Sequence, residues 1–327
     1  MIPLAEMRET RPMKLHGDVI STTTDVWSML AASKEGTLER VKDLAKHCPA
    51  LLTCQYDYTA PLHLAIREGH LDLVRFFVDH RALDLTYKTH PFLESLITVA
   101  EDRGYNAIAH FLKESLEDPK LTRAWGDTGK IDHGMDETQR RFQELVDKSM
   151  YDEVEELLQE RPELAKNDLA FWGEGILSAP ANGGDQQMLE LLMRFGARVP
   201  DLSKWGERYY FKHYGIAVFL MEHGMNPNHM NWHLTTLLHD KAFRGDLQKV
   251  RLLLDYGAHI DAVDEEFRST PLGFAARWGR REIAWLLLER GADPNKAGEP
   301  WATPLAWARK KGYPEIEADL LRAGAQY

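Results

Sequence analysis

Two acid–base pairs are the residues of this chain whose types and spacing could support chemistry. Glu207 precedes Arg208, and Asp240 precedes Lys241, so the same order of charges recurs 33 residues further along the chain. Charged groups in a partly desolvated site acquire perturbed pKa values, and such groups can act as acids, bases or ligand-binding groups. The pairs are therefore the first candidates for a functional site.

Histidines and large aromatic residues lie near both pairs in the sequence. His213 and His239 could exchange protons with a substrate, so with Glu207 and Asp240 they are the catalytic candidates if the protein is an enzyme. The same region could instead anchor a peptide, because aromatic side chains and arginine dominate interface energetics. The binding candidates are Trp172, Trp205, Glu207, Arg208, Tyr209, Tyr210, His213, His239, Asp240 and Lys241.

The acid–base pairs also have a purely structural interpretation. Glu207 could pair with Lys241, or Arg208 with Asp240, and such ion pairs can fix the register of packed elements without adding much stability. Three alternatives therefore stay open from the sequence. They are a structural ion-pair network, a polar–aromatic groove for a peptide, and a small-molecule pocket that could be catalytic.

A metal or cofactor site is not expected. His229 and His233 are four residues apart and would share a face only on a helix, and no carboxylate or cysteine completes a ligand set. Cys48 and Cys54, the two cysteines, form neither a CxxC motif nor a zinc-type array. We predict no metal and no cofactor.

The elements that carry these residues repeat with a period of about 33 residues. Thr270-Pro271-Leu272 recurs as Thr303-Pro304-Leu305, and Gly257-Ala258 recurs as Gly291-Ala292 and Gly324-Ala325. Apolar runs of helical type lie between these marks. Threonine before proline is a typical helix start, and glycine is a typical helix stop. Each period therefore predicts a helix, a turn and a second helix.

These residues resemble the ankyrin repeat. Ala60–Ala65 is similar to the TPLHxA signature of that family, with Ala60 in place of Thr, and Gly291–Asn295 is similar to its GAD-x-N ending. The resemblance implies an all-α solenoid of about nine helix-turn-helix units with one inserted loop. It also implies partner binding along a concave groove and at loop tips, and structural roles for His63 and His239.

The register of the repeats predicts four regions. Residues 1–24 are expected to be a flexible N-terminal tail that ends at a helix cap on Thr24 or Asp25. Residues 25–117 form repeats one to three, 118–138 form an inserted loop or linker, and 139–327 form repeats four to nine. A long insertion is usually functional or disordered, but a tolerated surface insertion is the favoured interpretation here, with Trp125 as an argument for a functional role.

Comparison of the repeats with one another makes the charged pairs unusual. Five and four residues before the glycine between helices, seven repeats carry apolar pairs that are expected to pack between neighbours. These pairs are Ala31-Ala32, Leu64-Ala65, Val99-Ala100, Leu145-Val146, Ala179-Pro180, Phe274-Ala275 and Trp307-Ala308. Repeats six and seven place Glu207-Arg208 and Asp240-Lys241 there instead. Buried charges are costly unless paired, so this position predicts a specialised inner face.

Composition excludes several classes of protein. The chain has 327 residues, of which 44% are hydrophobic, too many for a disordered chain. Its net charge of −11 argues against binding to nucleic acid. The longest apolar runs have six residues, Ile216–Met221 and Ile283–Leu288, so no membrane span is expected.

We predict a monomeric, cytoplasmic protein that binds a protein or peptide in the groove of repeats five to seven. The alternative is an enzyme or small-molecule binder that uses the same residues.

Overall fold

The computed structural model describes residues 1–123 and 130–326, and Trp125 therefore lies outside the described residues. The chain divides into two compact bodies. We call Glu6–His133 the N-terminal body, and Met1–Ala5 together with Gly134–Tyr327 the C-terminal body. Each is described by itself. Among the described residues, no helix has both the length and the apolar character that crossing a bilayer requires.

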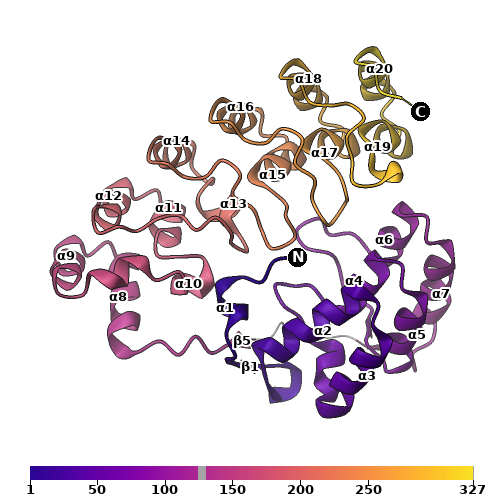
Figure 1. Ribbon diagram of the computed structural model, residues 1–327, viewed down its shortest axis with the longest axis horizontal. Helices are drawn as coiled ribbons and strands as arrows, with labels where there is room; N and C mark the ends of the chain where they lie inside the picture. The colour runs from indigo at the N-terminus through magenta and orange to yellow at the C-terminus, as the bar shows by residue number, and fades with distance from the viewer. Residues whose placement is uncertain (124–129, 327) are drawn as a thin grey trace. The chain divides into compact units, whose positions relative to one another are not determined.

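The N-terminal body is built from pairs of helices (Figure 1). The pairs are α2 (Thr23–Glu35) with α3 (Leu38–His47), α4 (Pro61–Arg67) with α5 (Leu71–Asp79), and α6 (Leu96–Asp102) with α7 (Asn106–Leu116). A 3-10 helix, η2 (Pro49–Thr53), follows the first pair. The apolar side chains of Val26, Leu64, Phe77 and Leu112 are fully buried, so the pairs share one core.

The expected flexible tail is wrong, because residues 1–24 form regular elements. They comprise α1 (Ala5–Arg8), β1 (Pro12–Lys14), the 3-10 helix η1 (His16–Asp18) and β2 (Ile20–Thr22). The two strands pair antiparallel, and Met13 is buried beneath them. The helix cap is Thr22, whose hydroxyl oxygen accepts a hydrogen bond from the Asp25 amide at 3.1 Å. Burial of short apolar segments therefore orders this region.

The described parts of the insertion at 118–138 are joined to the N-terminal body by strands. β4 (Thr122–Arg123) pairs parallel with β3 (Leu83–Asp84), and β5 (Lys130–Ile131) pairs antiparallel with β1. The next helix is capped by Asp136, which accepts from the Gln139 amide at 2.7 Å. The insertion therefore includes paired segments as well as loop, a difference from the predicted loop or linker.

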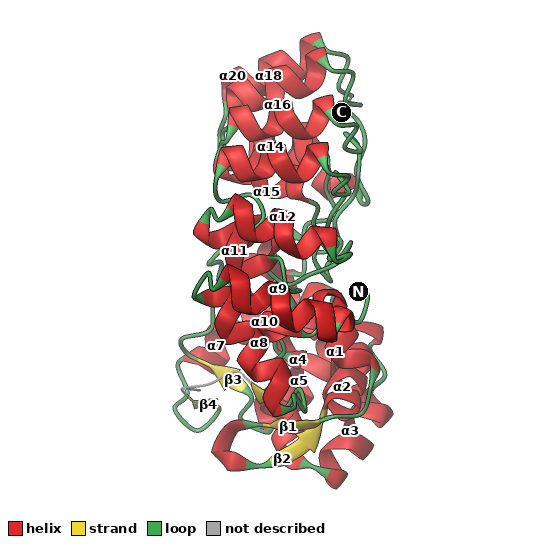
Figure 2. Ribbon diagram, turned by 90° about the vertical axis from the view of Figure 1, so that its left-hand side faces the viewer, coloured by secondary structure: helices red, strands yellow, loops and turns green. Residues whose placement is uncertain are grey.

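The C-terminal body consists mainly of helix pairs stacked along its length (Figures 1 and 2). Its inner row holds α8 (Glu137–Asp147), α11 (Ser178–Gly183), α13 (Gly206–Tyr209), α15 (Leu237–Arg244), α17 (Pro271–Arg277) and α19 (Pro304–Lys311). Its outer row holds α9 (Tyr151–Glu160), α12 (Gln186–Arg194), α14 (Tyr214–Glu222), α16 (Leu247–Asp255), α18 (Arg281–Glu289) and α20 (Pro314–Arg322). The short helices are η3 (Pro162–Lys166), α10 (Ala170–Gly173) and η4 (Pro300–Ala302).

A recurring hydrogen bond joins successive helix pairs in both bodies. A side chain at the start of an outer helix reaches the backbone carbonyl that lies two residues before the glycine of the preceding repeat. The bonds are His70 Nε2 to the Lys34 carbonyl (2.8 Å), His213 Nε2 to the Asn182 carbonyl (3.0 Å), and Arg280 Nε to the Phe243 carbonyl (3.0 Å). This contact gives His213 a structural role between repeats five and six.

Candidate functional site

The inner helix of repeat six differs from that of its neighbours. α13 is a single turn, and the residues that are fully buried there are Tyr210 and Phe211. Glu207 is half-buried and Arg208 is exposed, so the prediction that this pair occupies the packing position is wrong. Lys212 and Met150 stand where the other repeats carry glycine, but the bond from His213 to Asn182 keeps repeat six in the expected register, so the difference lies in the shortness of α13. In repeat seven, Asp240 and Lys241 are buried within α15.

A buried carboxylate of repeat five holds the start of α13. Glu174 is 1% exposed, and its carboxylate accepts hydrogen bonds from the amides of Lys204 (3.2 Å) and Trp205 (3.1 Å). Tyr210, which directly follows α13, holds the end of this helix by donating a hydrogen bond from its hydroxyl to the Glu174 carbonyl. Tyr210 is therefore a buried support and not a binding anchor. Glu174 was not among the residues predicted from the sequence, although its position between Gly173 and Gly175 is a recognisable signal.

A serine–histidine pair holds the other side of α13. Ser203 Oγ donates to His229 Nε2 at 2.8 Å, and His229 Nδ1 donates to the Pro200 carbonyl at 2.7 Å. Burial lowers the pKa of His229 to about 4, so the ring is neutral at pH 7. A Cβ at Gly206 would lie 1.9 Å from Nε2, so only glycine fits above the ring. Among the described residues, no group of histidines, cysteines or acids is placed to hold a metal ion.

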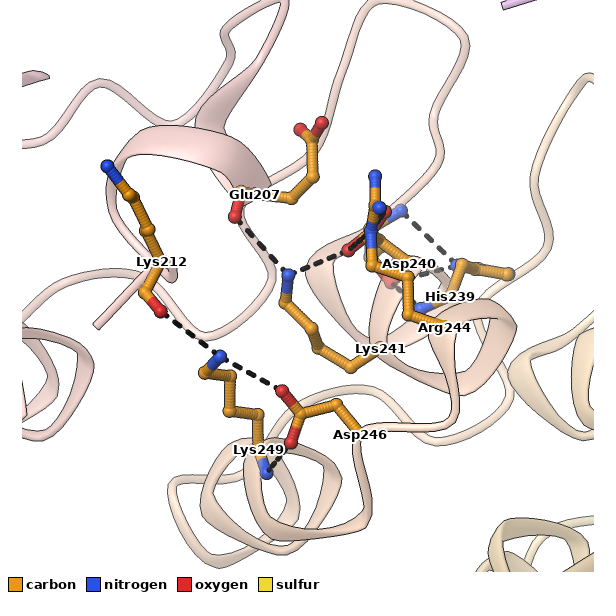
Figure 3. A network of polar contacts seen from close by, with 9 residues as sticks. Glu207, Lys212, His239, Asp240, Lys241, Arg244, Asp246 and Lys249 are labelled. Atoms are coloured by element: carbon orange, nitrogen blue, oxygen red, sulfur yellow. Dashed lines mark hydrogen bonds and ion pairs between the residues drawn. The ribbon is translucent and has the colours of Figure 1, made fainter. Parts of the chain in front are cut away.

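The charges of α15 form an ion-pair network within one helix (Figure 3). The Asp240 carboxylate accepts from Lys241 Nζ at 2.7 Å and from Arg244 Nε at 2.8 Å. Lys241 Nζ also donates to the backbone carbonyl of Glu207 at 3.3 Å. The predicted ion pairs Glu207–Lys241 and Arg208–Asp240 are not formed. The link between the two repeats is instead made by a backbone carbonyl.

The Glu207 carboxyl group stands apart from this network. It makes no hydrogen bond or ion pair with any other residue that the structure describes, and in Figure 3 it points away from Lys241 Nζ. Burial, and next the charge of Asp240, raise the pKa of Glu207 to about 8, although Lys241 and Arg244 oppose the shift. Glu207 is therefore mainly protonated at pH 7.

The four catalytic candidates do not assemble into an acid–base site. His239 is fully buried, with Nδ1 bonded to the Thr236 hydroxyl at 2.8 Å and Nε2 donating to the Ser269 carbonyl at 3.1 Å. Burial lowers the pKa of His239 to about 4. His213 is engaged with the Asn182 carbonyl, and Asp240 is neutralised by two cations. His239 thus has the structural role that the resemblance implied, and the geometry gives the enzyme alternative no support.

A set of exposed and half-buried side chains lies around α10 and α13. Trp172 is 68% exposed, and both it and Phe171 adopt left-handed backbone, with φ of 63° and 49°. Lys204 Nζ donates to the Trp172 carbonyl, and the Arg208 guanidinium lies 5.2 Å from the centre of the Trp205 ring. We call Trp172, Lys204, Trp205 and Arg208 the tryptophan–arginine surface. Tyr209 lies half-buried beside it.

Comparison with protein families identifies ankyrin repeats in two parts of the chain. A family model of ankyrin repeats (3 copies) matches residues 208–298 and 238–327, and a model of the single ankyrin repeat matches 58–90. The chain contains ankyrin repeats. The sequence-based prediction of an all-α ankyrin solenoid is confirmed.

Curated relatives share the ankyrin repeats over limited lengths. The palmitoyltransferase Hip14 of Drosophila melanogaster is 39% identical over 75 residues, which are 23% of this chain and 12% of that protein. The 2-5A-dependent ribonuclease of Mus musculus is 41% identical over 61 residues, 19% of this chain and 8% of that protein. The putative ankyrin repeat protein FPV014 of fowlpox virus is 31% identical over 131 residues, 38% of this chain and 29% of that protein. The chain thus spans less than a third of each of these relatives.

Proposed function

We propose that this chain binds a protein partner through the inner face of ankyrin repeats five to seven, with Trp172 as the anchor. The observation that carries the proposal is an indole that is 68% exposed on two consecutive left-handed residues. Such backbone costs on the order of 1–3 kcal/mol per residue and clusters at functional sites. Ankyrin repeats typically mediate protein–protein interactions, which supports the same function.

The neighbouring side chains have the composition of an interface hot spot. Tryptophan and arginine are enriched among the residues that contribute most to binding energy, and the Arg208 guanidinium lies over the Trp205 ring. An indole that projects from the surface fits a pocket on a macromolecule, whereas a small molecule requires a concave site. The proposal includes a cytoplasmic location and a monomeric state, and a net charge far from zero supports the monomeric state.

The experiment compares Trp172→Ala with Trp285→Ala, a control in which an exposed tryptophan (56%) is removed from outer helix α18. Proteins captured by the wild-type chain are identified by mass spectrometry, and the affinity of each purified candidate is then measured. We expect Trp172→Ala to weaken binding at least about 30-fold, as removal of a hot spot of about 2 kcal/mol does. Trp285→Ala should bind normally.

A second variant, Trp172→Gly, separates binding from folding. Glycine adopts the left-handed conformation without strain, so this variant should be more stable than Trp172→Ala by about 1 kcal/mol. Both variants should lose binding equally, because both lack the indole. If Trp172→Ala retains every partner of the wild-type chain, the proposal is wrong.

A further inference from the structure

We propose that the partner segment that meets the tryptophan–arginine surface is acidic. Its carboxylates pair with Arg208 and with the terminal nitrogens of Arg244, and its apolar side chain packs against Trp172 and Trp205. This inference rests on the proposed function and specifies the chemistry of its partner.

The first evidence is a local reversal of charge. The chain as a whole carries a net charge of −11. Residues 203–209 and 237–244, which include α13 and α15, nevertheless hold four lysine and arginine side chains against two acidic ones. Of the two acidic side chains, Asp240 is neutralised by two cations. The inner face of repeats six and seven is therefore a basic region on an acidic protein, and this favours an acidic ligand.

Arg208 is placed to receive a carboxylate. Its side chain is exposed, and it makes no ion pair with any residue that the structure describes. Its guanidinium lies over the Trp205 ring, an arrangement that leaves the N–H groups at its edge available. A stacked guanidinium has little freedom left to lose, so it can bind a carboxylate in the bidentate geometry that arginine favours.

Arg244 offers a second cationic group on the neighbouring helix. Its Nε donates to both oxygens of Asp240, at 2.8 and 3.0 Å, and this fixes the guanidinium. Its two terminal nitrogens have no hydrogen-bond partner among the described residues, and the side chain is 45% exposed. The guanidinium is therefore oriented by one carboxylate and able to bind another.

Protonated Glu207 makes this region receptive to an anion. The charged groups that face its carboxyl are Asp240, Lys241 and Arg244 on α15, with Arg208 beside it on α13. A protonated carboxyl can donate a hydrogen bond to an incoming carboxylate, whereas an ionised one repels it. Because the pKa of Glu207 is about 8, binding of an acidic segment should weaken as the pH rises from 7 to 9.

The test selects ligands without assuming their sequence. Random 12-residue peptides displayed on phage are selected on the full chain, and the recovered peptides are labelled for fluorescence polarisation. We expect them to combine Asp or Glu with an aromatic or aliphatic residue. The Arg208→Ala/Arg244→Ala double variant should bind them at least tenfold more weakly than the wild-type chain. Arg251→Ala, which removes an exposed arginine from outer helix α16, should bind normally.

The pH dependence gives an independent readout. Wild-type affinity for the selected peptides should fall between pH 7 and 9, and Glu207→Gln should remove most of that fall. Neutral or basic peptides, no recovered peptide at all, or an unchanged affinity of the double arginine variant would overturn the inference. Stronger binding of a 12-residue oligouridine probe would also overturn it, because the surface would then recognise phosphates.

The same measurements distinguish this inference from the proposed function. If the peptides require Trp172 but do not depend on Arg208 and Arg244, repeats five to seven still bind a protein and only the acidic character is wrong. If Trp172→Ala binds the peptides as well as the wild-type chain does, the proposed function itself fails.

Discussion

Lys241 shows how a single residue constrains this protein. It is 3% exposed, and its ammonium group is held by the Asp240 carboxylate and the Glu207 carbonyl. An apolar substitute for a whole buried ion pair is often tolerated, but removal of one partner leaves an uncompensated charge. The pair therefore matters chiefly because neither of its members can be lost alone.

A comparison of single and double variants tests this dependence. Asp240→Leu should lower the free energy of unfolding by about 3 kcal/mol, because Lys241 remains buried without its carboxylate. Asp240→Leu/Lys241→Met should recover most of that loss. Urea unfolding followed by circular dichroism measures both values. A double variant that is no more stable than the single one would contradict the interpretation.

Glu207 should make stability depend on pH in the alkaline direction. Its pKa is about 8 in the folded protein, above its usual value of 4.5, so the folded chain retains a proton that the unfolded chain releases. Stability is therefore expected to fall as the pH rises from 4.5 through 8. Glu207→Gln should be less sensitive over this range. Thermal unfolding of both proteins measures this. A difference in melting temperature between wild type and Glu207→Gln that is the same at every pH would refute the prediction.

At the scale of elements, α13 is a helix too short to fix its own position. Glu174 binds its first amides from the preceding repeat, and His229 binds Ser203 from the loop that follows α14. The exposed Arg208 and the half-buried Trp205 therefore belong to a turn that hydrogen bonds hold on both sides. A clamped turn can present binding residues with little loss of conformational entropy when a partner binds.

Two glycine variants test whether the clamp is needed. Gly206→Ala places a Cβ 1.9 Å from His229 Nε2, so it should destabilise the protein by about 1–3 kcal/mol and weaken binding at the tryptophan–arginine surface. Gly215→Ala is the control, since its Cβ meets nothing within 4 Å and alanine favours the helix α14. Chemical denaturation and peptide affinity are measured for both. Equal effects of the two variants would show that the clamp is unimportant.

At the scale of the whole molecule, two buried histidines predict where acid acts first. Burial lowers the pKa values of His229 and His239 to about 4. Between pH 6.5 and 4 these histidines therefore bind protons in the unfolded chain but not in the folded chain. Stability should be lost as the pH falls from 6.5 toward 4. Hydrogen exchange should lose protection at 200–213 and 236–244 before α18 and α20. Simultaneous loss throughout the C-terminal body would argue against this assignment.

Much of the fold could be predicted from the sequence because most repeats carry the same features, such as a glycine between their two helices. The hairpin of β1 and β2 could not, since three-residue strands carry little periodicity and β5 comes from more than 100 residues away. The binding residues of the candidate site stay a prediction. Trp172 and Arg208 are exposed and Trp205 is half-buried, whereas Glu174 and the Ser203–His229 pair depend on loop geometry that the sequence does not reveal. Repeat six keeps its register without the glycine, but the sequence does not reveal that α13 is a single turn.

The hydrogen bond that joins successive repeats also orders events during synthesis. The carbonyls of Lys34, Asn182 and Phe243 accept hydrogen bonds from side chains that lie 36, 31 and 37 residues further along the chain. A ribosome makes the chain from its N-terminus, so each inner helix emerges before the residue that completes its last turn. During synthesis, each of these repeats should therefore complete its last hydrogen bond only after the next repeat has been made. The most recently synthesised repeat should still lack this bond.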